Sequence, residues 1–443
     1  MERSEEPLHT TWLHSDRFVP RRFVQPLRRF VEIEAASGIV LLVAAVAALV
    51  WANAPFGETY QQVWNTHLTL SVGGFRFDEP LRHIINDGLM AVFFFVVGLE
   101  IKRELVLGEL RDPKAAALPA VAALGGMIGP ALIYLAFAAG VGGEALRGWG
   151  IPVATDIAFA VGVLALLGSR VPLGAKLFLL ALAIADDIGA ITVIALFYTD
   201  DLSARWLGAS VASLALVALS NRVGIRSLAV YVPLALAAWY CLLESGVHAT
   251  LSGVALGLLT PAHQMYGAKE YDQKARRILD TYPAEGTTQA GRERSDYEAI
   301  LLTEISREAV SPLSRLEHRL QLWSSFGVVP VFALANAGVS FAGTSVGEAL
   351  LTPIALGVGL GLVIGKMVGV SAFAWLAVRM GWGRLPSGTG WTHVVGLAGV
   401  AGIGFTVALF VAELAFTDRG LADLAKVGVF AGSATAGILG TLL

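Results

Sequence analysis

The sequence predicts an all-α membrane protein that crosses the bilayer many times. Of its 443 residues, 55% are hydrophobic and only 15% are charged, whereas about 25% of the residues in a typical soluble domain are charged. The mean hydropathy is +0.66, and the 49 glycines suit helices that pack closely inside a bilayer. The one cysteine, Cys241, has no partner for an internal disulfide bond. We expect a polytopic helical membrane protein with no nucleic-acid partner.

Apolar segments long enough to span a bilayer recur along the chain. A transmembrane helix needs about 20 mainly apolar residues. The sequence predicts about twelve such helices, of which the sixth, seventh and twelfth are short. Their ranges are 35–54, 84–101, 115–141, 150–169, 177–199, 206–221, 227–243, 245–262, 323–345, 349–378, 391–414 and 425–443.

The distribution of lysine and arginine predicts the orientation. With both termini in the cytoplasm, the inside segments carry 25 of the 32 lysines and arginines. The outside loops carry only Arg76, Arg82, Arg147, Arg205, Arg419 and Lys426. Cytoplasmic loops are usually the richer in these residues, so we expect a multi-pass membrane protein with both termini cytoplasmic. The charged N-terminal stretch has no apolar core, and no cleavable signal peptide is expected.

Two stretches between the spans have patterns of their own. Residues 67–78 alternate in polarity around Gly73 and Gly74, which predicts a small external β-hairpin with a two-residue turn. Residues 263–322 are polar and charged, with a helical pattern from Tyr297 to Leu322. The predicted organisation is a cytoplasmic tail at 1–34, helices 1–8 at 35–262, a cytoplasmic linker at 263–322 and helices 9–12 at 323–443.

Four charged residues lie deep within the predicted spans. They are Asp156, Asp186, Asp187 and Lys366, each near the middle of its apolar segment. Charges at this depth cost at least a few kcal/mol on insertion scales and usually mark ion or proton pathways. One lysine can neutralise one aspartate, but the three carboxylates together carry more negative charge than one lysine can neutralise. The surplus negative charge predicts a site for a mobile cation or for protons.

Two of the predicted spans carry signals for an interrupted helix. In the span 150–169, Pro152 lacks an N–H group and disfavours helix before it, and the polar pair Thr155 and Asp156 follows. The span 391–414 carries four glycines within nine residues, and the two spans share Ile, Phe and Val in register. Interrupted helices in corresponding halves of a transporter often mark its binding site. Asp156 would then offset positive helix N-termini where the two helices cross.

Protons and cations can compete for the same aspartate oxygens. Burial favours the protonated form of a carboxyl group, and adjacent carboxyl groups titrate as a coupled pair. Once ionised, Asp186 and Asp187 can bind Na⁺ with help from the Thr155 hydroxyl and water. Lys366 can pair with an aspartate when the cation is absent. If the site faces one side of the membrane at a time, this competition suffices for exchange, without a cofactor and without enzyme chemistry.

Three other functions also place carboxylates inside a membrane. A cation channel needs a filter ring, usually contributed by several subunits, which a buried Asp–Lys set in one chain does not supply. An intramembrane aspartyl protease would share a proton between aspartates on facing helices, whereas Asp186 and Asp187 are adjacent on one helix. A proton-coupled carrier for another cation or an organic solute stays open on the sequence alone.

Five motifs together resemble those of the NhaA-type bacterial sodium/proton antiporters. They read NDGLMAVFFFVVGLEIKREL at 86–105, ATDIAFAVG at 154–162, AIADDIG at 183–189, SGVHAT at 245–250 and FALANAG at 332–338. The resemblance runs from about Ala36 to the C-terminus. It implies twelve helices with inverted repeats, in which the fourth and eleventh are broken and cross.

The resemblance also implies roles for particular residues. Asp186 and Asp187 match the pair that binds Na⁺ and protons. Thr155 and Asp156 match the residues at the crossing, and Lys366 matches the intramembrane lysine. A cytoplasmic group linked to pH sensing is implied for Glu100, Arg103, Glu104, His248 and Glu317. The implied function is electrogenic, pH-regulated exchange of Na⁺ or Li⁺ for protons by a homodimer joined through the external hairpin.

Overall fold

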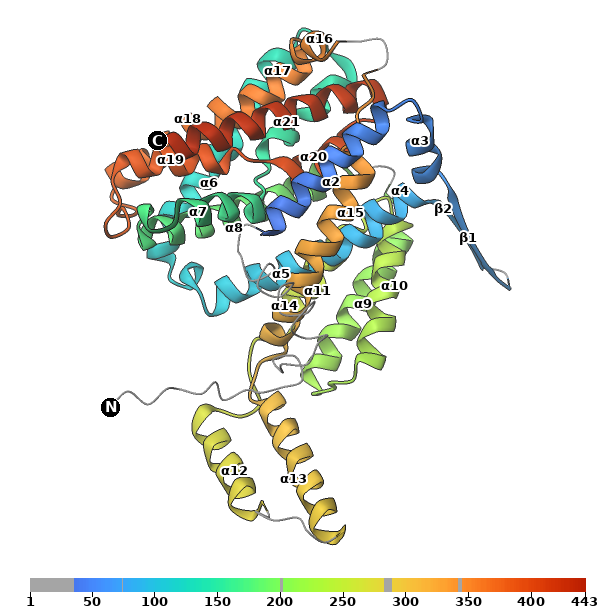
Figure 1. Ribbon diagram of the computed structural model, residues 1–443, viewed down its shortest axis with the longest axis vertical. Helices are drawn as coiled ribbons and strands as arrows, with labels where there is room; N and C mark the ends of the chain where they lie inside the picture. Colours follow the sequence, from blue (N-terminus) through green and yellow to red (C-terminus); the bar gives the residue numbers. More distant parts are fainter. Residues whose placement is uncertain (1–35, 74, 200–201, 283–288, 342–344) are drawn as a thin grey trace. The chain divides into compact units, whose positions relative to one another are not determined.

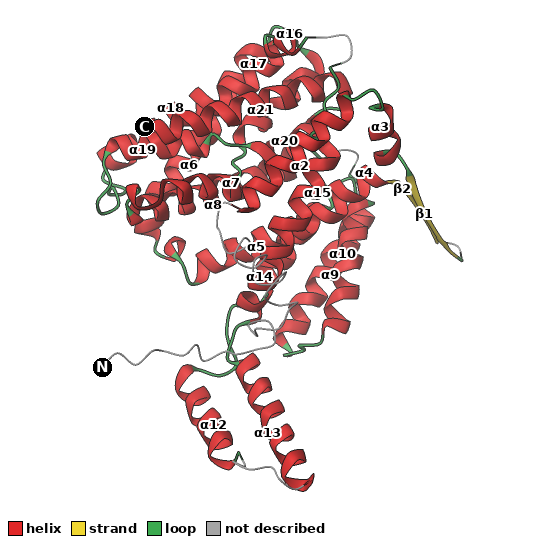
Figure 2. Cartoon of the chain, in the orientation of Figure 1, coloured by secondary structure: helices red, strands yellow, loops and turns green. Residues whose placement is uncertain are grey.

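The computed structural model (Figure 1) describes residues 36–73, 75–199, 202–282, 289–341 and 345–443. The predicted N-terminal tail and Gly74 of the predicted turn lie outside these residues. Helices make up most of the described chain (Figure 2), which confirms the predicted helical class. The chain divides into two compact units, described separately below. The first unit is Met1–Asn86, Asp112–Tyr198 and Ser325–Leu443, and the second is Asp87–Arg111 and Thr199–Ser324.

The first unit contains most of the long apolar helices. Its α-helices are α2 (Ala36–Asn53), α3 (Glu58–Trp64), α4 (Leu81–His83), α6 (Pro113–Ala138), α7 (Ile157–Leu167), α8 (Leu173–Phe197), α15 (Val329–Asn336), α16 (Val346–Leu350), α17 (Pro353–Leu360), α18 (Lys366–Arg379), α19 (Trp391–Ala401), α20 (Phe405–Ala415) and α21 (Arg419–Leu442). The unit also contains two helical segments that are not α-helical. They are the 3₁₀ segment η5 (Gly143–Val153) and the π-helical segment η8 (Gly361–Gly365), which joins α17 to α18. Within this unit, α21 packs against α17, α19 and α20 (Figure 1).

The strands of the first unit form a β-hairpin. Strand β1 (His67–Val72) pairs antiparallel with β2 (Phe75–Pro80), with Val72 opposite Phe75. Gly73 in the turn has a φ of 60°, a conformation that glycine adopts without strain. The predicted small hairpin is therefore confirmed, and β2 extends two residues beyond the predicted end.

Glycines let α6 and α18 cross with their backbones in contact. A Cβ atom on Gly129 would lie 2.5 Å from the carbonyl oxygen of Gly365, and one on Gly369 would overlap the carbonyl group of Gly125. Small residues allow such close helix contacts in membranes. A Cβ atom on Gly126 would lie 3.6 Å from Cδ of Lys366. The close contact of α6 with α18 therefore leaves room for the Lys366 side chain beside Gly126.

Among the described residues of the second unit, all regular secondary structure is helical. The helices are α5 (Met90–Val106), α9 (Ala204–Arg222), α10 (Leu228–Leu243), α11 (Thr250–Leu259), α12 (Ala268–Thr281), α13 (Gln289–Glu308) and α14 (Pro312–Trp323), with a short 3₁₀ turn, η4 (Glu109–Arg111). Helices α5 and α11 cross at glycines: a Cβ atom on Gly98 would lie 2.7 Å from the Val254 carbonyl oxygen. Leu99, Ala262 and Leu313 form a small core of this unit.

The structure tests the predicted spans by length and composition. All twelve predicted segments contain helix. Six helices in the described part of the chain are long and apolar enough to cross a membrane, and two bent pairs bring the number to as many as eight. Helices α10 and α11 are apolar but shorter. The total of twelve spans and the inverted repeats stay predictions.

Two predicted boundaries near the polar linker were wrong. The predicted helix from Tyr297 to Leu322 is divided, because α13 ends at Glu308 and α14 begins at Pro312. Proline suits a first helical turn, and the Ser311 side chain caps this turn by accepting from the Ser314 N–H group. Helix α14 then continues through the π-helical segment η7 (Ser324–Val328) into α15. The helix assigned to 323–345 therefore covers 312–336.

Candidate functional site

The first broken helix is interrupted just before α7. Segment η5 ends at Val153, α7 begins at Ile157, and the two differ in direction by 40°. Pro152 lies in the last turn of η5, where its missing N–H group weakens continued helix. Asp156 is the N-cap of α7, and its Oδ1 accepts a hydrogen bond from the Phe159 N–H group at 3.0 Å. The interruption predicted here is confirmed.

The second broken helix is interrupted between α19 and α20. These helices end at Ala401 and begin at Phe405, and they differ in direction by 47°. A Cβ atom on Gly402 would overlap the carbonyl oxygen of Leu362, and one on Gly404 would lie 2.9 Å from the carbonyl oxygen of Ala154. Glycine is needed at both positions because neighbouring backbone comes so close. This confirms the predicted second interruption and explains its glycines.

The two interruptions are hydrogen-bonded to each other. The Thr155 hydroxyl donates to the Ala401 carbonyl oxygen at 2.8 Å, and the Asp156 N–H group donates to the Ile403 carbonyl oxygen at 2.7 Å. Oδ2 of Asp156 accepts from both the N–H group and the hydroxyl of Thr406, at the start of α20. One carboxylate therefore satisfies the N-terminal ends of two helices, which carry partial positive charge. Sequence reasoning missed Thr406, although it lies in the segment whose Ile, Phe and Val match those after Thr155.

The two adjacent aspartates lie on α8 and are almost fully buried. Asp186 is 2% exposed, Asp187 7% and Lys366, at the start of α18, 1%. The Nζ atom of Lys366 lies 2.5 Å from Oδ2 of Asp186. The other oxygen of Asp186, Oδ1, is buried and has no hydrogen-bond partner among the described residues. Successive residues of a helix are about 100° apart, so the two carboxylates leave α8 in different directions.

Helix α8 connects the aspartate pair to the broken helices. It packs against η5, α7 and α19, which flank the two interruptions. The first unit therefore contains three buried carboxyl groups and one buried ammonium group, and α8, which carries two of the carboxyls, packs against the broken helices. All five residues predicted for the ion site, Thr155, Asp156, Asp186, Asp187 and Lys366, are buried in it.

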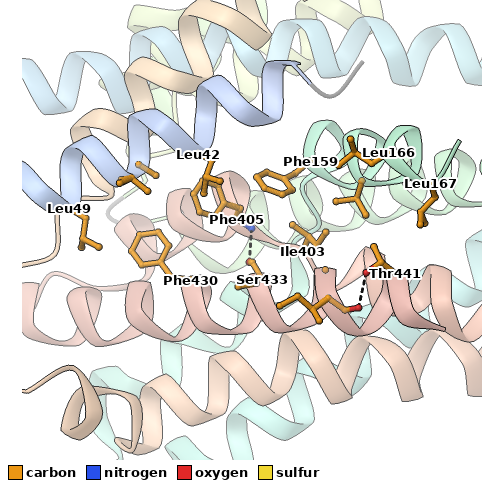
Figure 3. Close-up of a pocket in the computed structure, with 16 residues that line it drawn as sticks. Leu42, Leu49, Phe159, Leu166, Leu167, Ile403, Phe405, Phe430, Ser433 and Thr441 are labelled. Atoms are coloured by element: carbon orange, nitrogen blue, oxygen red, sulfur yellow. Dashed lines mark hydrogen bonds between the residues drawn. The ribbon is translucent and has the colours of Figure 1, made fainter. Parts of the chain in front are cut away.

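An apolar cavity of about 580 Å³ lies beside this crossing, lined by α2, α7, α20 and α21 (Figure 3). Its lining includes Leu42, Phe159 and Phe430 and no charged side chain. The hydroxyl of Ser433 accepts from the Phe405 N–H group at 3.2 Å, and the Thr441 hydroxyl donates to the Ile438 carbonyl oxygen. The cavity therefore offers no carboxylate ligand for a cation.

Most of the predicted pH-sensing residues form one group in the second unit. Arg103 on α5 forms an ion pair with Glu317 on α14, and its Nη2 atom lies 3.5 Å from Oε1 of Glu104. Glu100 lies one turn earlier on α5, within electrostatic range of these three side chains. Burial raises the pKa of Glu317, and the Arg103 guanidinium beside it opposes that rise. Glu317 thus takes up its proton at a higher pH than a solvent-exposed glutamate.

His248 lies apart from this group, contrary to the grouping expected from the resemblance. Helices α5 and α11 run in the same direction, because Gly253 contacts Ala91 and Gly257 contacts Gly98. His248 precedes α11, at the end that lies next to the start of α5. Arg103 lies twelve residues after Ala91, roughly 18 Å along the helix. Spacing in sequence could not reveal this separation, because it depends on the direction in which two distant helices pack.

Sequence reasoning also missed a second ion pair, in which the lysine is buried and the glutamate is partly buried. The Nζ atom of Lys426 on α21 lies 2.5 Å from Oε1 of Glu413 on α20, and Lys426 is only 3% exposed. The sequence places Lys426 among the outside loops, whereas in the structure it lies on α21. The available signal was the glutamate near the end of the apolar span 391–414, next to a span that opens with a lysine.

The fold and the site together define the class of protein. Two interrupted helices that meet inside a helical membrane protein, with carboxylates at and beside the interruption, are typical of ion-coupled secondary transporters. The comparisons with known proteins name the family. The chain belongs to the Na+/H+ antiporter 1 family, whose family model matches residues 28–443.

Curated relatives match nearly the whole chain. The Na(+)/H(+) antiporter NhaA 2 of Sorangium cellulosum is 47% identical over 425 residues, which are 96% of this chain and 90% of that protein. The Na(+)/H(+) antiporter NhaA of Rhodopirellula baltica is 47% identical over 420 residues, covering 95% of this chain and 93% of that protein. The Na(+)/H(+) antiporter NhaA of Oleidesulfovibrio alaskensis is 45% identical over 95% of this chain and 94% of that protein.

Proposed function

We propose that this multi-pass membrane protein exchanges Na⁺, or Li⁺, for protons by alternating access, as a transporter and not an enzyme. The observation that carries the proposal is the buried group of three carboxyls with one ammonium. An uncompensated buried charge is strongly destabilising, so protons or a cation must balance the surplus. Membership of a Na⁺/H⁺ antiporter family supports this choice over a channel or an organic-solute carrier.

The carboxyl groups have different surroundings, and we assign them different roles. Asp156 accepts hydrogen bonds from Phe159 and Thr406 and stays ionised as a fixed counter-charge to two helix ends. Asp186 is held by the Lys366 ammonium when the cation is absent. Asp187 carries a proton in that state.

Binding of Na⁺ between the two aspartates displaces both protons. The cation takes the place of the Lys366 ammonium beside Asp186, one proton leaves Asp187, and a second leaves Lys366. No cofactor takes part. Two protons cross in one direction for each Na⁺ in the other, so one net charge moves per cycle. Each net charge is worth roughly 2.3 kcal/mol per 100 mV of membrane potential.

Purified protein in sealed vesicles tests this function. An imposed Na⁺ gradient should change the internal pH, and an imposed voltage should shift the gradient at which the flux reverses. A reversal point that does not respond to voltage would mean one-for-one exchange. A Na⁺ current without proton movement would mean a channel, and proton uptake driven only by an organic solute would mean a different carrier.

We further propose that the protein is a homodimer joined through its hairpin. A two-stranded sheet has unpaired backbone groups along both outer edges, and Leu68 and Leu70 on β1 are more than half exposed. Pairing of two hairpins would satisfy both features. Deletion of residues 68–79 should halve the mass of the detergent-solubilised particle in light scattering. A particle of unchanged mass would refute this interface.

The charge distribution and the family support a proposal for the membrane and for the side on which the termini lie. We propose that the protein lies in a bacterial inner membrane with both termini in the cytoplasm. A reporter enzyme that is active only outside the cytoplasm, fused to Leu443, should be silent. Activity of that fusion would reverse the orientation.

The Arg103–Glu317 group is proposed as the pH sensor, and it gives a specific expectation. Glu317→Gln removes the charge at every pH, so the arrangement favoured at low pH should persist to higher pH. A coupling of roughly 1–3 kcal/mol is usual between such sites, and about 1.4 kcal/mol equals one pH unit for one proton. The exchange–pH curve should move by about one unit towards higher pH, with maximal exchange preserved.

The measurement is exchange from about pH 6 to pH 9, with Glu304→Gln as the matched control. Glu304 lies on α13 and is exposed, so its variant should follow the wild-type curve. A Glu317→Gln curve that does not shift, or that is lowered equally at every pH, would remove this group from the sensor. We propose that His248, which precedes α11 and lies near the start of α5, acts separately from the group.

A further inference from the structure

The Lys426–Glu413 ion pair ties together the two helices that follow the second interruption. Helices α20 and α21 run antiparallel and are joined at two places. Near the interruption, the Phe405 N–H group donates to the Ser433 hydroxyl, as Figure 3 shows. About two turns further along, Lys426 Nζ lies 2.5 Å from Glu413 Oε1. Together the two links fix how far α20 can slide along α21.

Further charged groups surround this ion pair. Asp423 lies one turn before Lys426, with its Oδ1 atom 3.5 Å from Nζ. Arg82, just after the hairpin, lies within electrostatic range of both Glu413 and Asp423, as Arg419 does of Glu413. The guanidinium of Arg82 also donates to the Gln61 side chain at 3.1 Å and lies over the Tyr60 ring. The group brings together two acidic side chains and three basic ones.

Stability alone gives little reason for such a pair. A buried ion pair can often be replaced by apolar residues of similar volume without loss of stability, whereas removal of one partner is costly. A buried pair can instead specify one arrangement of helices among several. In this protein the arrangement matters, because the first turn of α20 holds Thr406 against Asp156.

We propose that Lys426 is a positioning residue for the cation site. By holding Glu413 near the C-terminal end of α20, it fixes the position of the N-terminal end that Asp156 caps. It touches neither the cation nor the aspartate pair on α8. Loss of the pair lets α20 shift along α21 and weakens cation binding at the crossing. This inference rests on the exchange activity proposed above and assigns that activity a further determinant.

The test compares apparent KM for Na⁺ with melting temperature in purified variants. Lys426→Met should raise the KM at least about fivefold, in the range of usual couplings between sites, and lower the melting temperature. The double variant Lys426→Met/Glu413→Gln removes both charges, so its melting temperature should recover while its KM stays raised. Lys426→Arg keeps the pair and should keep the wild-type KM. Lys269→Met, at an exposed position on α12, is the matched control.

The outcomes separate the two proposals. A double variant with the wild-type KM would overturn the positioning role. The link between α20 and α21 would then be unnecessary for Na⁺ binding, and the effect of the single variant would come only from the unpaired charge of Glu413. If the single methionine variant fails to fold, the double variant and Glu413→Asp, which keeps the charge but shortens the reach, still decide through their KM values. A wild-type protein that performs no exchange would instead refute the proposed function.

Discussion

Asp187→Asn is expected to reduce Na⁺-driven proton movement to the background of empty vesicles. The variant keeps the shape of the side chain but cannot ionise, so it neither gives up a proton nor adds a carboxylate ligand for Na⁺. Asp186→Asn should be as inactive and also less stable. It leaves the buried Lys366 ammonium without its partner, and breaking a buried ion pair costs roughly 3–5 kcal/mol.

The comparison uses protein quantified in vesicles, with a fluorescent pH indicator inside and a pulse of Na⁺ outside. Asp272→Asn is the matched control, because Asp272 is exposed on α12 and pairs only with Arg276 there, among the contacts described. Its variant should be fully active. Wild-type exchange by Asp187→Asn, measured in the same vesicles, would remove the aspartate pair from the mechanism.

Gly402→Ala is expected to cause the second largest loss. Its new methyl group would overlap the Leu362 carbonyl oxygen at the interruption between α19 and α20. Overpacking of this kind typically costs about 1–3 kcal/mol. Backbone cannot yield here without moving Ile403, whose carbonyl oxygen accepts from the Asp156 N–H group. Exchange should fall at least about tenfold, since roughly 1.4 kcal/mol corresponds to a factor of ten.

Gly437→Ala on α21 is the control for added volume. The nearest atom to its new methyl group is Cδ1 of Ile403, at 3.4 Å, an ordinary contact. Both variants should elute as single species in size-exclusion chromatography. If Gly402→Ala exchanges ions at the wild-type rate, close backbone contact at the interruption is not needed for transport.

The sequence allowed the class, the interruptions and the buried charged residues to be predicted for physical reasons. Charge is costly inside a bilayer, so Asp156, Asp186, Asp187 and Lys366 stand out against their apolar neighbours. Proline and clustered glycines weaken a helix locally, so both interruptions could be located. The alternation of polar and apolar residues around Gly73 was enough to predict the hairpin.

Contacts between distant segments could not be read in the same way. Thr406 looks like an ordinary helix residue until its hydroxyl is found on Asp156. The ion pair of Lys426 with Glu413 lies near span ends, where charge is common and suggests a loop. The separation of His248 from Arg103 depends on the direction in which α5 and α11 pack. In each case the missing information is which residues tertiary packing brings together.

The central claim is that Na⁺ and protons compete for the same buried carboxylates. It is tested most directly by the apparent KM for Na⁺ in exchange assays with equal pH on both sides of the vesicle membrane. Over the range in which the site titrates, the KM should rise about tenfold per unit decrease in pH for each proton displaced. A maximal rate that falls with pH while the KM for Na⁺ stays constant would contradict competition and would require separate sites for the two ions.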